Sequence, residues 1–313
     1  MTQQPPTTPT LTDADRVRRL EHPARRVDVV LDTDTYNEID DQFALAYALL
    51  SPEHLDVQAV YAAPFHNTRS SGPADGMQRS YEEIGRVLDR LGRTEVPALR
   101  GAESWFAESG PDTGGDAAAD LIARAMARPA DDPLYVVAIG APTNIAAALT
   151  REPRIIDRVV MVWLGGHALH WPNANEFNLQ QDVPASRVLF DCGVPLVHLP
   201  CQGVVRLLAT TRPELRANLA GRSPIADYLL SIYEDYMDDT PARSKVIWDL
   251  APVAWLIDPR WAETILTPSP IIASDQPPRY AFDARRHLIR SAVSVKRDAI
   301  FGDLFAKLSD AGA

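Results

Sequence analysis

Short, continuously apolar segments alternate along the chain with longer segments in which apolar residues recur at helical spacing. The short segments are rich in β-branched residues, as buried parallel strands are, and they cover residues 29–31, 55–63, 134–139 and 159–164. The helical period covers residues 42–50, 81–91, 117–127 and 224–237. This alternation predicts right-handed βαβ units, and therefore an α/β fold with a mostly parallel, Rossmann-like sheet and helices on both faces.

The chain is long enough for one large core, with 313 residues of which 46% are hydrophobic. No internal repeat or linker divides it, and residues 270–310 add strands and a helix compatible with the same sheet. Residues 1–13 are rich in Thr, Pro and Gln and cannot form a core. We therefore predict a disordered tail over residues 1–25 and a single domain over residues 26–313.

Charge and cysteine content narrow the class of partner and the compartment. The net charge of −11, without a compensating basic block, argues against nucleic acid or an anionic membrane as partner and favours a small substrate that is uncharged or bound with a cation. Cys192 and Cys201 are too few for a disulfide framework. With no signal-peptide pattern and no apolar run long enough to span a bilayer, we expect a soluble, cytoplasmic protein.

Four aspartates follow the first strand within ten positions: Asp32, Asp34, Asp40 and Asp41. Open α/β sheets bind ligands at the carboxyl ends of their strands, where this group falls. Carboxylates crowded beside an apolar core are costly unless a cation or protons neutralise them. Oxygen ligands without neighbouring Cys or His favour Ca²⁺ or Mg²⁺. The alternative interpretation is a solvated acidic turn that caps the following helix.

This stretch resembles the N-terminal signature of the inosine-uridine-preferring nucleoside hydrolases, Asp-x-Asp-Pro-Gly-x-Asp-Asp. The family has three residues between the second and third aspartates, whereas here residues 35–39 intervene and the Pro-Gly turn is absent. The loop must therefore be rebuilt if Asp34 and Asp41 are to converge. The sequence Asp32-Thr33-Asp34-Thr35 also resembles the nucleophile motif of haloacid-dehalogenase-type phosphatases.

Three further blocks in the same order resemble the nucleoside hydrolases, so that the resemblance covers residues 27–255. Residues 140–144 are similar to the Gly-Pro-Leu-Thr-Asn turn of the family. Gly165-Gly166, followed by Glu176-Phe177-Asn178, is the most specific match. Trp248-Asp249 is similar to the C-terminal His-Asp-Pro-x-Ala block, with tryptophan in place of histidine.

The resemblance implies calcium-dependent hydrolysis of the N-glycosidic bond of a ribonucleoside, giving ribose and a free base. It implies that Asp34, Asp41, Asp249 and the main-chain carbonyl of Thr143 hold Ca²⁺, with Asp34 also acting as general base. Thr143 has an alternative interpretation as a helix N-cap. Asp32 is expected to orient its neighbours without contacting the metal.

The same resemblance implies that Asp40, Glu176 and Asn178 bind the ribose hydroxyls. The residue that would hold the 5′-hydroxyl has three candidates, which are His170, Asn173 and Asn175. No choice among these three follows from the sequence.

Trp248 bears on the choice of base. In the inosine-uridine-preferring group the histidine at this position protonates the leaving base, whereas the purine-preferring inosine-adenosine-guanosine group has tryptophan there. The resemblance therefore implies a purine nucleoside as substrate, with Trp248 stacked on the base, and a homo-oligomer, either dimer or tetramer. A second stacking aromatic is expected among Trp105, Phe106 and Trp171. The alternative is that Trp248 only fills the core.

Two other functions stay open. A phosphatase would need a lysine, for which Lys245 and Lys296 are available, and an acidic pair, for which Asp303 is a weak candidate. That hypothesis explains neither Glu176-Phe177-Asn178 nor Trp248-Asp249. A nucleoside- or ribose-binding homologue that has lost catalysis through the rebuilt 35–39 loop is the second alternative, and an assay for nucleoside hydrolysis separates it from an enzyme.

Overall fold

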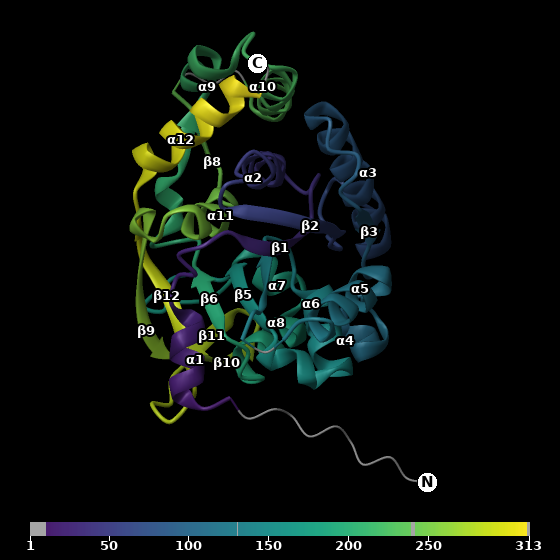
Figure 1. The fold of residues 1–313 in the computed structure, drawn as a ribbon, viewed down its shortest axis with the longest axis vertical. Helices are drawn as coiled ribbons and strands as arrows, with labels where there is room; N and C mark the ends of the chain where they lie inside the picture. Colours follow the sequence, from purple (N-terminus) through teal and green to yellow (C-terminus); the bar gives the residue numbers. More distant parts are fainter. Residues whose placement is uncertain (1–10, 130, 239–241, 312–313) are drawn as a thin grey trace.

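A mostly parallel sheet of eight strands forms the centre of the molecule, in a computed structural model that describes residues 11–129, 131–238 and 242–311 (Figure 1). The strands, in their order across the sheet, are β3 Ala98–Arg100, β2 Leu55–Ala62, β1 Val27–Thr33, β4 Leu134–Ala138, β5 Val159–Leu164, β6 Leu196–Leu199, β12 Leu288–Val295 and β9 Ala262–Pro268. Only the pairing of β12 with the edge strand β9 is antiparallel. The predicted α/β class and parallel sheet are confirmed.

Helices cover both faces of this sheet (Figure 1). One face carries α2 Asp40–Leu49, α3 Pro73–Leu91, α9 Arg212–Leu219, α10 Pro224–Tyr236, α11 Leu250–Ile257 and α12 Arg297–Asp310. The other carries α4 Phe106–Ser109, α5 Gly115–Met126, α6 Thr143–Arg151, α7 Phe177–Gln181 and α8 Val183–Asp191. Strand β1 packs on both layers, since Val29 and Leu31 belong to one apolar cluster and Val30 to the other. This two-sided burial explains its unbroken apolar sequence.

Smaller elements complete the fold. Two antiparallel pairs of strands lie outside the main sheet. One joins β7 Ala209–Thr211 to β8 Ser244–Val246, and the other is the hairpin of β10 Ile271–Asp275 and β11 Pro278–Ala281. Short 3₁₀ helices are η1 Gly110–Asp112, η2 Pro153–Asp157, η3 Val205–Leu207 and η4 Pro259–Trp261. Among the described helices, none is both long and apolar enough to cross a bilayer.

The strand order places a crevice beside β1. The chain proceeds from β1 outward through β2 to β3, then returns to the other side of β1 and proceeds through β4, β5 and β6. Connections therefore leave β1 and β4 in opposite directions, which opens a crevice at the carboxyl ends of these two strands. The residues that directly follow β1 and β4 lie at this opening.

Two expectations from the sequence were wrong. Residues 13–20, assigned to the tail, form helix α1 Asp13–Leu20, whose Leu20 is buried and whose Arg16 donates a hydrogen bond to the carbonyl of Gly193. The helix is amphipathic and short, so composition alone concealed it; residues 1–10 of the predicted tail lie outside the described part. Residues 68–76 are rich in Ser, Gly and Pro, which predicts a loop over this whole stretch, but the loop ends at Gly72, because Pro73 begins α3.

Candidate active site and metal centre

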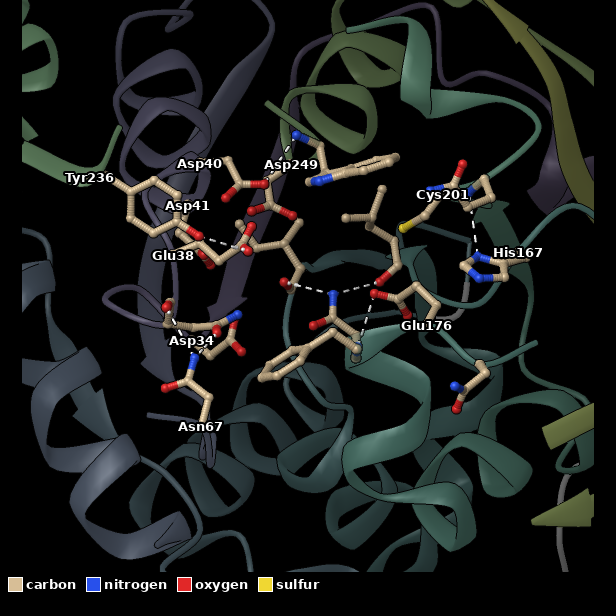
Figure 2. Close-up of a pocket in the computed structure, with 18 of the residues that line it drawn as sticks. Asp34, Glu38, Asp40, Asp41, Asn67, His167, Glu176, Cys201, Tyr236 and Asp249 are labelled. Carbon is tan, nitrogen blue, oxygen red and sulfur yellow. Dashed lines mark hydrogen bonds between the residues drawn. The ribbon is translucent and has the colours of Figure 1, made fainter. Parts of the chain in front are cut away.

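A cavity of about 560 Å³ lies at the carboxyl ends of the central strands. Figure 2 shows its acidic wall, built from the loop after β1, the first turn of α2 and the start of α11, facing a wall built from α7 and the residues after β5 and β6. The acidic wall contains Asp34, Asp40, Asp41 and Asp249, which the sequence had placed at the site. The crevice predicted by the topology is therefore the cavity in which the candidate residues meet.

The aspartates of this wall are buried and close together. One carboxylate oxygen each from Asp40, Asp41 and Asp249 lies within 4.8 Å of the others. Burial, reinforced by the charge of Asp40, raises the pKa of Asp41 to about 7. Burial raises the pKa of Asp249 well above its ordinary value, and the charges of its neighbours Asp40, Asp41 and Asp34 raise it further. These aspartates can all stay ionised only beside a compensating positive charge.

Asp34 gives the clearest sign of a missing partner. Its side chain is fully buried, and neither carboxylate oxygen has a hydrogen-bond partner among the described residues. Burial raises its pKa well above the ordinary value, and the charges of Asp41 and Asp40 raise it further. Buried oxygens without donors are costly, whereas a hard cation uses such oxygens as ligands. The donor set therefore fits a divalent ion such as Ca²⁺.

Asp40 differs from the other three in its contacts. Its Oδ2 accepts a hydrogen bond from the main-chain N–H of Trp248 at 3.1 Å, and its Oδ1 lies 3.4 Å from the Nζ of Lys245. The sequence assigned Asp40 to the ribose, whereas the structure places it among the carboxylates that could hold a metal. Both of its oxygens are, however, already engaged by donors.

Glu176 and Asn178 lie on the opposite wall, where Glu176 caps α7. Glu176 accepts hydrogen bonds from the main-chain N–H groups of Gly166, Asn178 and Leu179. Burial nevertheless raises its pKa to about 7. The side-chain amide of Asn178 donates to the carbonyls of Ile139 and Leu164, at 3.0 and 3.1 Å. These bonds tie α7 to the ends of β4 and β5 and fix both side chains in the cavity wall.

Thr143 does not line the cavity. It is the first residue of α6 and fully buried, and its hydroxyl donates to Asp182 at 2.8 Å. As in any helix, its carbonyl is directed along the helix axis toward the next turn. The residue of this junction that lines the cavity is Ile139, directly after β4. Asp32 also lies behind the wall, where its Oδ1 accepts from the amide of Asn144 at 2.8 Å.

Of the candidates for the 5′-hydroxyl, Asn175 lines the cavity and His170 and Asn173 do not. Asn173 instead accepts a hydrogen bond from the main-chain N–H of Asn175 at 3.0 Å. None of the three aromatic residues proposed to stack opposite Trp248 lines the cavity either, namely Trp105, Phe106 and Trp171. Trp248 itself does, together with Phe177 and Tyr236.

The constellation that a phosphatase would need is not assembled. Neither Lys296 nor Asp303 lines the cavity. Asp303 lies in α12 and accepts a hydrogen bond from Tyr47. Of the two lysines considered, only Lys245 approaches the acidic wall.

The rebuilt loop over residues 35–39 is held by the segment that follows β2. Asn67 donates to the side chain of Asn37 at 2.7 Å, and Arg69 donates to the carbonyl of Glu38 at 3.0 Å. The Arg69 guanidinium also lies 4.1 Å from the ring centre of Tyr36, whose φ of 102° is unusual for a residue with a side chain. These contacts replace the lost Pro-Gly turn, and they bring Asn37, Glu38 and Asn67 into the cavity wall.

Several residues that line the cavity were not predicted from the sequence. Asn67 could have been found by the rule that located Asp34, since it follows a parallel strand. Phe177 lies inside the Glu-Phe-Asn match, where only its neighbours had been given roles. Glu38 and Tyr236 reach the cavity through tertiary contacts. Tyr236 is one of three tyrosines at helical spacing, with Tyr228 and Tyr233, which the sequence leaves open between the core and a lid.

Comparison with known proteins agrees with this geometry. The family model described as inosine-uridine preferring nucleoside hydrolase matches residues 29–297. The pyrimidine-specific ribonucleoside hydrolase RihA of Citrobacter koseri is 27% identical over 256 residues, which cover 72% of this chain and 78% of that protein.

Solved structures share the fold. A plant nucleoside hydrolase, PpNRh1, superposes with a TM-score of 0.74 at 21% identity, covering 90% of this chain and 99% of that one. A purine-preferring ribonucleoside hydrolase from Gardnerella vaginalis superposes with a TM-score of 0.69 at 22% identity, covering 91% of this chain and 98% of that one. With a family match over most of its length and acidic residues gathered at the carboxyl ends of its strands, the chain belongs to the nucleoside hydrolase family, whose members are N-ribohydrolases.

Proposed function

We propose that the protein hydrolyses the N-glycosidic bond of ribonucleosides, that it requires Ca²⁺ and that it prefers purines. The observation that carries the proposal is Asp34, a buried carboxylate to which no described residue donates a hydrogen bond, in the same cavity as Asp41, Asp249 and Trp248. The products are ribose and the free base.

Asp34, Asp41 and Asp249 would hold the cation, together with the carbonyl of Ile139 in place of that of Thr143. The lining of the cavity supports this exchange, because Ile139 borders it and Thr143 does not. When bound, the divalent ion supplies a positive charge that lowers the pKa of a nearby water. The carboxylates that would remain costly without the ion are then compensated.

Asp34 acts as general base in this proposal. Its position directly after β1, facing the cavity, lets one oxygen accept a proton from the attacking water. Asp40, Glu176 and Asn178 bind the sugar hydroxyls and hold the ring in place. As the glycosidic bond breaks, the sugar gains oxocarbenium character, and the acidic wall stabilises that positive charge.

Trp248 acts on the leaving base. An indole N–H is too weak an acid to protonate a purine at neutral pH. Its face can instead stack on the base and stabilise the cationic form created by protonation from solvent. Phe177 and Tyr236, which border the same cavity, are the candidates for a second aromatic contact.

Base release from a panel of purine, pyrimidine and modified nucleosides, with and without a chelator, tests the proposal. We expect purine nucleosides to have the highest kcat/KM, and we expect the chelator to abolish activity until Ca²⁺ is restored. Higher kcat/KM for uridine or cytidine would contradict the purine preference. Binding of nucleosides without any hydrolysis would instead favour the ribose-binding alternative.

We further propose that the protein acts in the cytoplasm. Both cysteines are free, with Cys201 buried in the cavity wall, and neither requires an oxidising compartment. The predicted dimer or tetramer stays a prediction.

A further inference from the structure

A lysine lies against the acidic wall of the cavity, in contact with two of its carboxylates. Lys245, in β8, has a side chain that is only 11% exposed. Its Nζ lies 2.6 Å from Oε2 of Glu38, 3.4 Å from Oδ1 of Asp40 and 2.9 Å from the carbonyl of Val246. Among the blocks that resemble the family, none accounts for this residue.

The contacts of Lys245 indicate that it acts on neighbouring side chains and not directly on a substrate. An ammonium group has three N–H donors, and three acceptors already surround this one. It therefore has no further donor to offer a substrate. Any effect on the reaction must pass through the carboxylates of Asp40 and Glu38.

Both carboxylate oxygens of Asp40 are held by donors, and Lys245 is one of these donors. One carboxylate oxygen of Asp40 faces the ammonium, and the other accepts the main-chain N–H of Trp248, three residues further along the same segment. Asp34, by contrast, accepts no hydrogen bond on either oxygen from the part of the chain that the structure describes. A cation competes poorly for a carboxylate that an ammonium group already faces, since the two positive charges repel each other. The contacts thus distinguish Asp40 from Asp34, although both border the same cavity.

The rebuilt loop supplies the partner that holds Lys245. Glu38 lies in the five-residue stretch that distinguishes this chain from the family signature, and its Oε1 also accepts a hydrogen bond from Tyr236 at 3.1 Å. The lysine and the altered loop therefore depend on each other. In the family signature the residue two positions before the third aspartate is glycine, which has no side chain to hold a lysine, whereas Glu38 stands there in this chain.

We propose that Lys245 is a positioning residue that orients Asp40 toward the sugar hydroxyls and keeps it out of the metal coordination sphere, while Glu38 holds Lys245 in place. This inference rests on the proposed function, because it assumes a nucleoside in the cavity and a cation at Asp34, Asp41 and Asp249.

The test compares Lys245→Met with Lys245→Arg. Methionine keeps an unbranched side chain only one atom shorter and removes the charge, whereas arginine retains a charged donor group. We expect Lys245→Met to raise the KM for the best nucleoside about tenfold or more, as loss of a charge-assisted contact does. Calorimetry should show that Ca²⁺ binds at least as tightly as in the wild type, because a repelling charge is gone. Arginine should recover most of the KM.

Lys307→Met is the matched control. Lys307 pairs with Glu53 and is 16% exposed, but it lies in α12, away from the cavity. This variant should leave both KM and calcium affinity at wild-type values. Melting curves of all variants show whether each is folded.

Glu38→Gln keeps the inference testable if Lys245→Met does not fold. We expect it to change KM in the same direction by a smaller factor, and the double variant to be no worse than Lys245→Met alone, since Glu38 acts through Lys245. An unchanged KM in folded Lys245→Met, or weaker Ca²⁺ binding in parallel with the raised KM, would overturn the proposal. If the wild type itself releases no base from any nucleoside, the proposed function fails instead.

Discussion

Two strand-to-helix junctions meet at the cavity, and they differ in how sequence relates to position. The junction after β1 departs from the family signature over residues 35–39, yet its aspartates at 34, 40 and 41 all border the cavity. The junction after β4 matches a family motif well, yet Thr143 lies outside the cavity wall. The difference teaches that agreement with a family motif does not by itself place a residue at the cavity, whereas the residue directly after each of these strands does border it. Asp34 and Ile139 each directly follow a central strand.

The largest effect that tests this comparison is expected from Asp34→Asn. The amide cannot accept the proton of the attacking water, so kcat should fall about 10²–10⁴-fold. The metal-free variant should melt no lower than metal-free wild type, because one of the crowded carboxylates is gone. Asp28→Asn is the control at the opposite end of β1, where Asp28 pairs with Arg128. Near wild-type turnover in folded Asp34→Asn would remove Asp34 from the mechanism.

Trp248→Ala should have the next largest effect, and it should depend on the base. A stacking and cation–π contribution of about 0.5–2 kcal/mol corresponds to a loss of about 2- to 30-fold in kcat/KM for purine nucleosides. Hydrolysis of p-nitrophenyl riboside, whose leaving group needs no protonation, should change little. Equal losses on the two substrates would show that Trp248 supports the fold of the site and does not act on the base.

Thr143→Val tests the junction after β4. It removes a donor to buried Asp182, which also accepts from the main-chain N–H of Phe106, so stability should fall by about 1–3 kcal/mol. The kcat of the folded fraction should stay near the wild-type value, in contrast to Asp34→Asn. Denaturant unfolding and single-temperature kinetics give the two quantities. A loss of turnover without a loss of stability would return Thr143 to the site.

The smallest expected effect is the change with pH in the stability of the metal-free protein, which the acidic wall causes. Burial raises the pKa values of Asp41 and Glu176 to about 7, so the folded protein binds protons that the unfolded chain has released. Stability of the chelated protein should therefore fall as pH rises from 6.5 to 8.5. Buried His198, with its pKa lowered to about 4, offsets part of this fall near pH 6.5, where the unfolded chain still binds a proton at this histidine, and adds no pH dependence well above that value.

Calcium at about 100 times its dissociation constant should add roughly 2.7 kcal/mol of stability. It should also reduce the pH dependence, because the ion takes the place of the protons. Melting temperatures in chelator and in calcium, at both pH values, measure the two effects. Equal melting temperatures in chelator and calcium would argue against a cation at this wall.

The fold was predictable because its strands are buried on both faces and leave continuous apolar runs. The aspartates were predictable because they follow such a run. Lys245 and Glu38 were not, since they lie 207 positions apart and only the tertiary fold brings them together. Tyr236 and His167 likewise line the cavity through packing that no local pattern encodes. Helix α1 was missed because its few apolar residues contact a distant part of the chain, where Arg16 meets Gly193.

Gly140, two residues after the end of β4, sets how close the two central strand ends can lie. A Cβ atom there would be 3.1 Å from the main-chain nitrogen of Asp34 and from Cβ of Ala63, and 3.2 Å from Cγ of Asp34. Even the smallest side chain would therefore push against the carboxylate that we assign as general base. Replacement of this glycine during evolution is thus constrained by the neighbouring strand and by the chemistry there, in addition to any demand of its own turn. Gly140→Ala is therefore the smallest substitution that would push the two strand ends apart, and it would widen the crevice by fractions of an ångström.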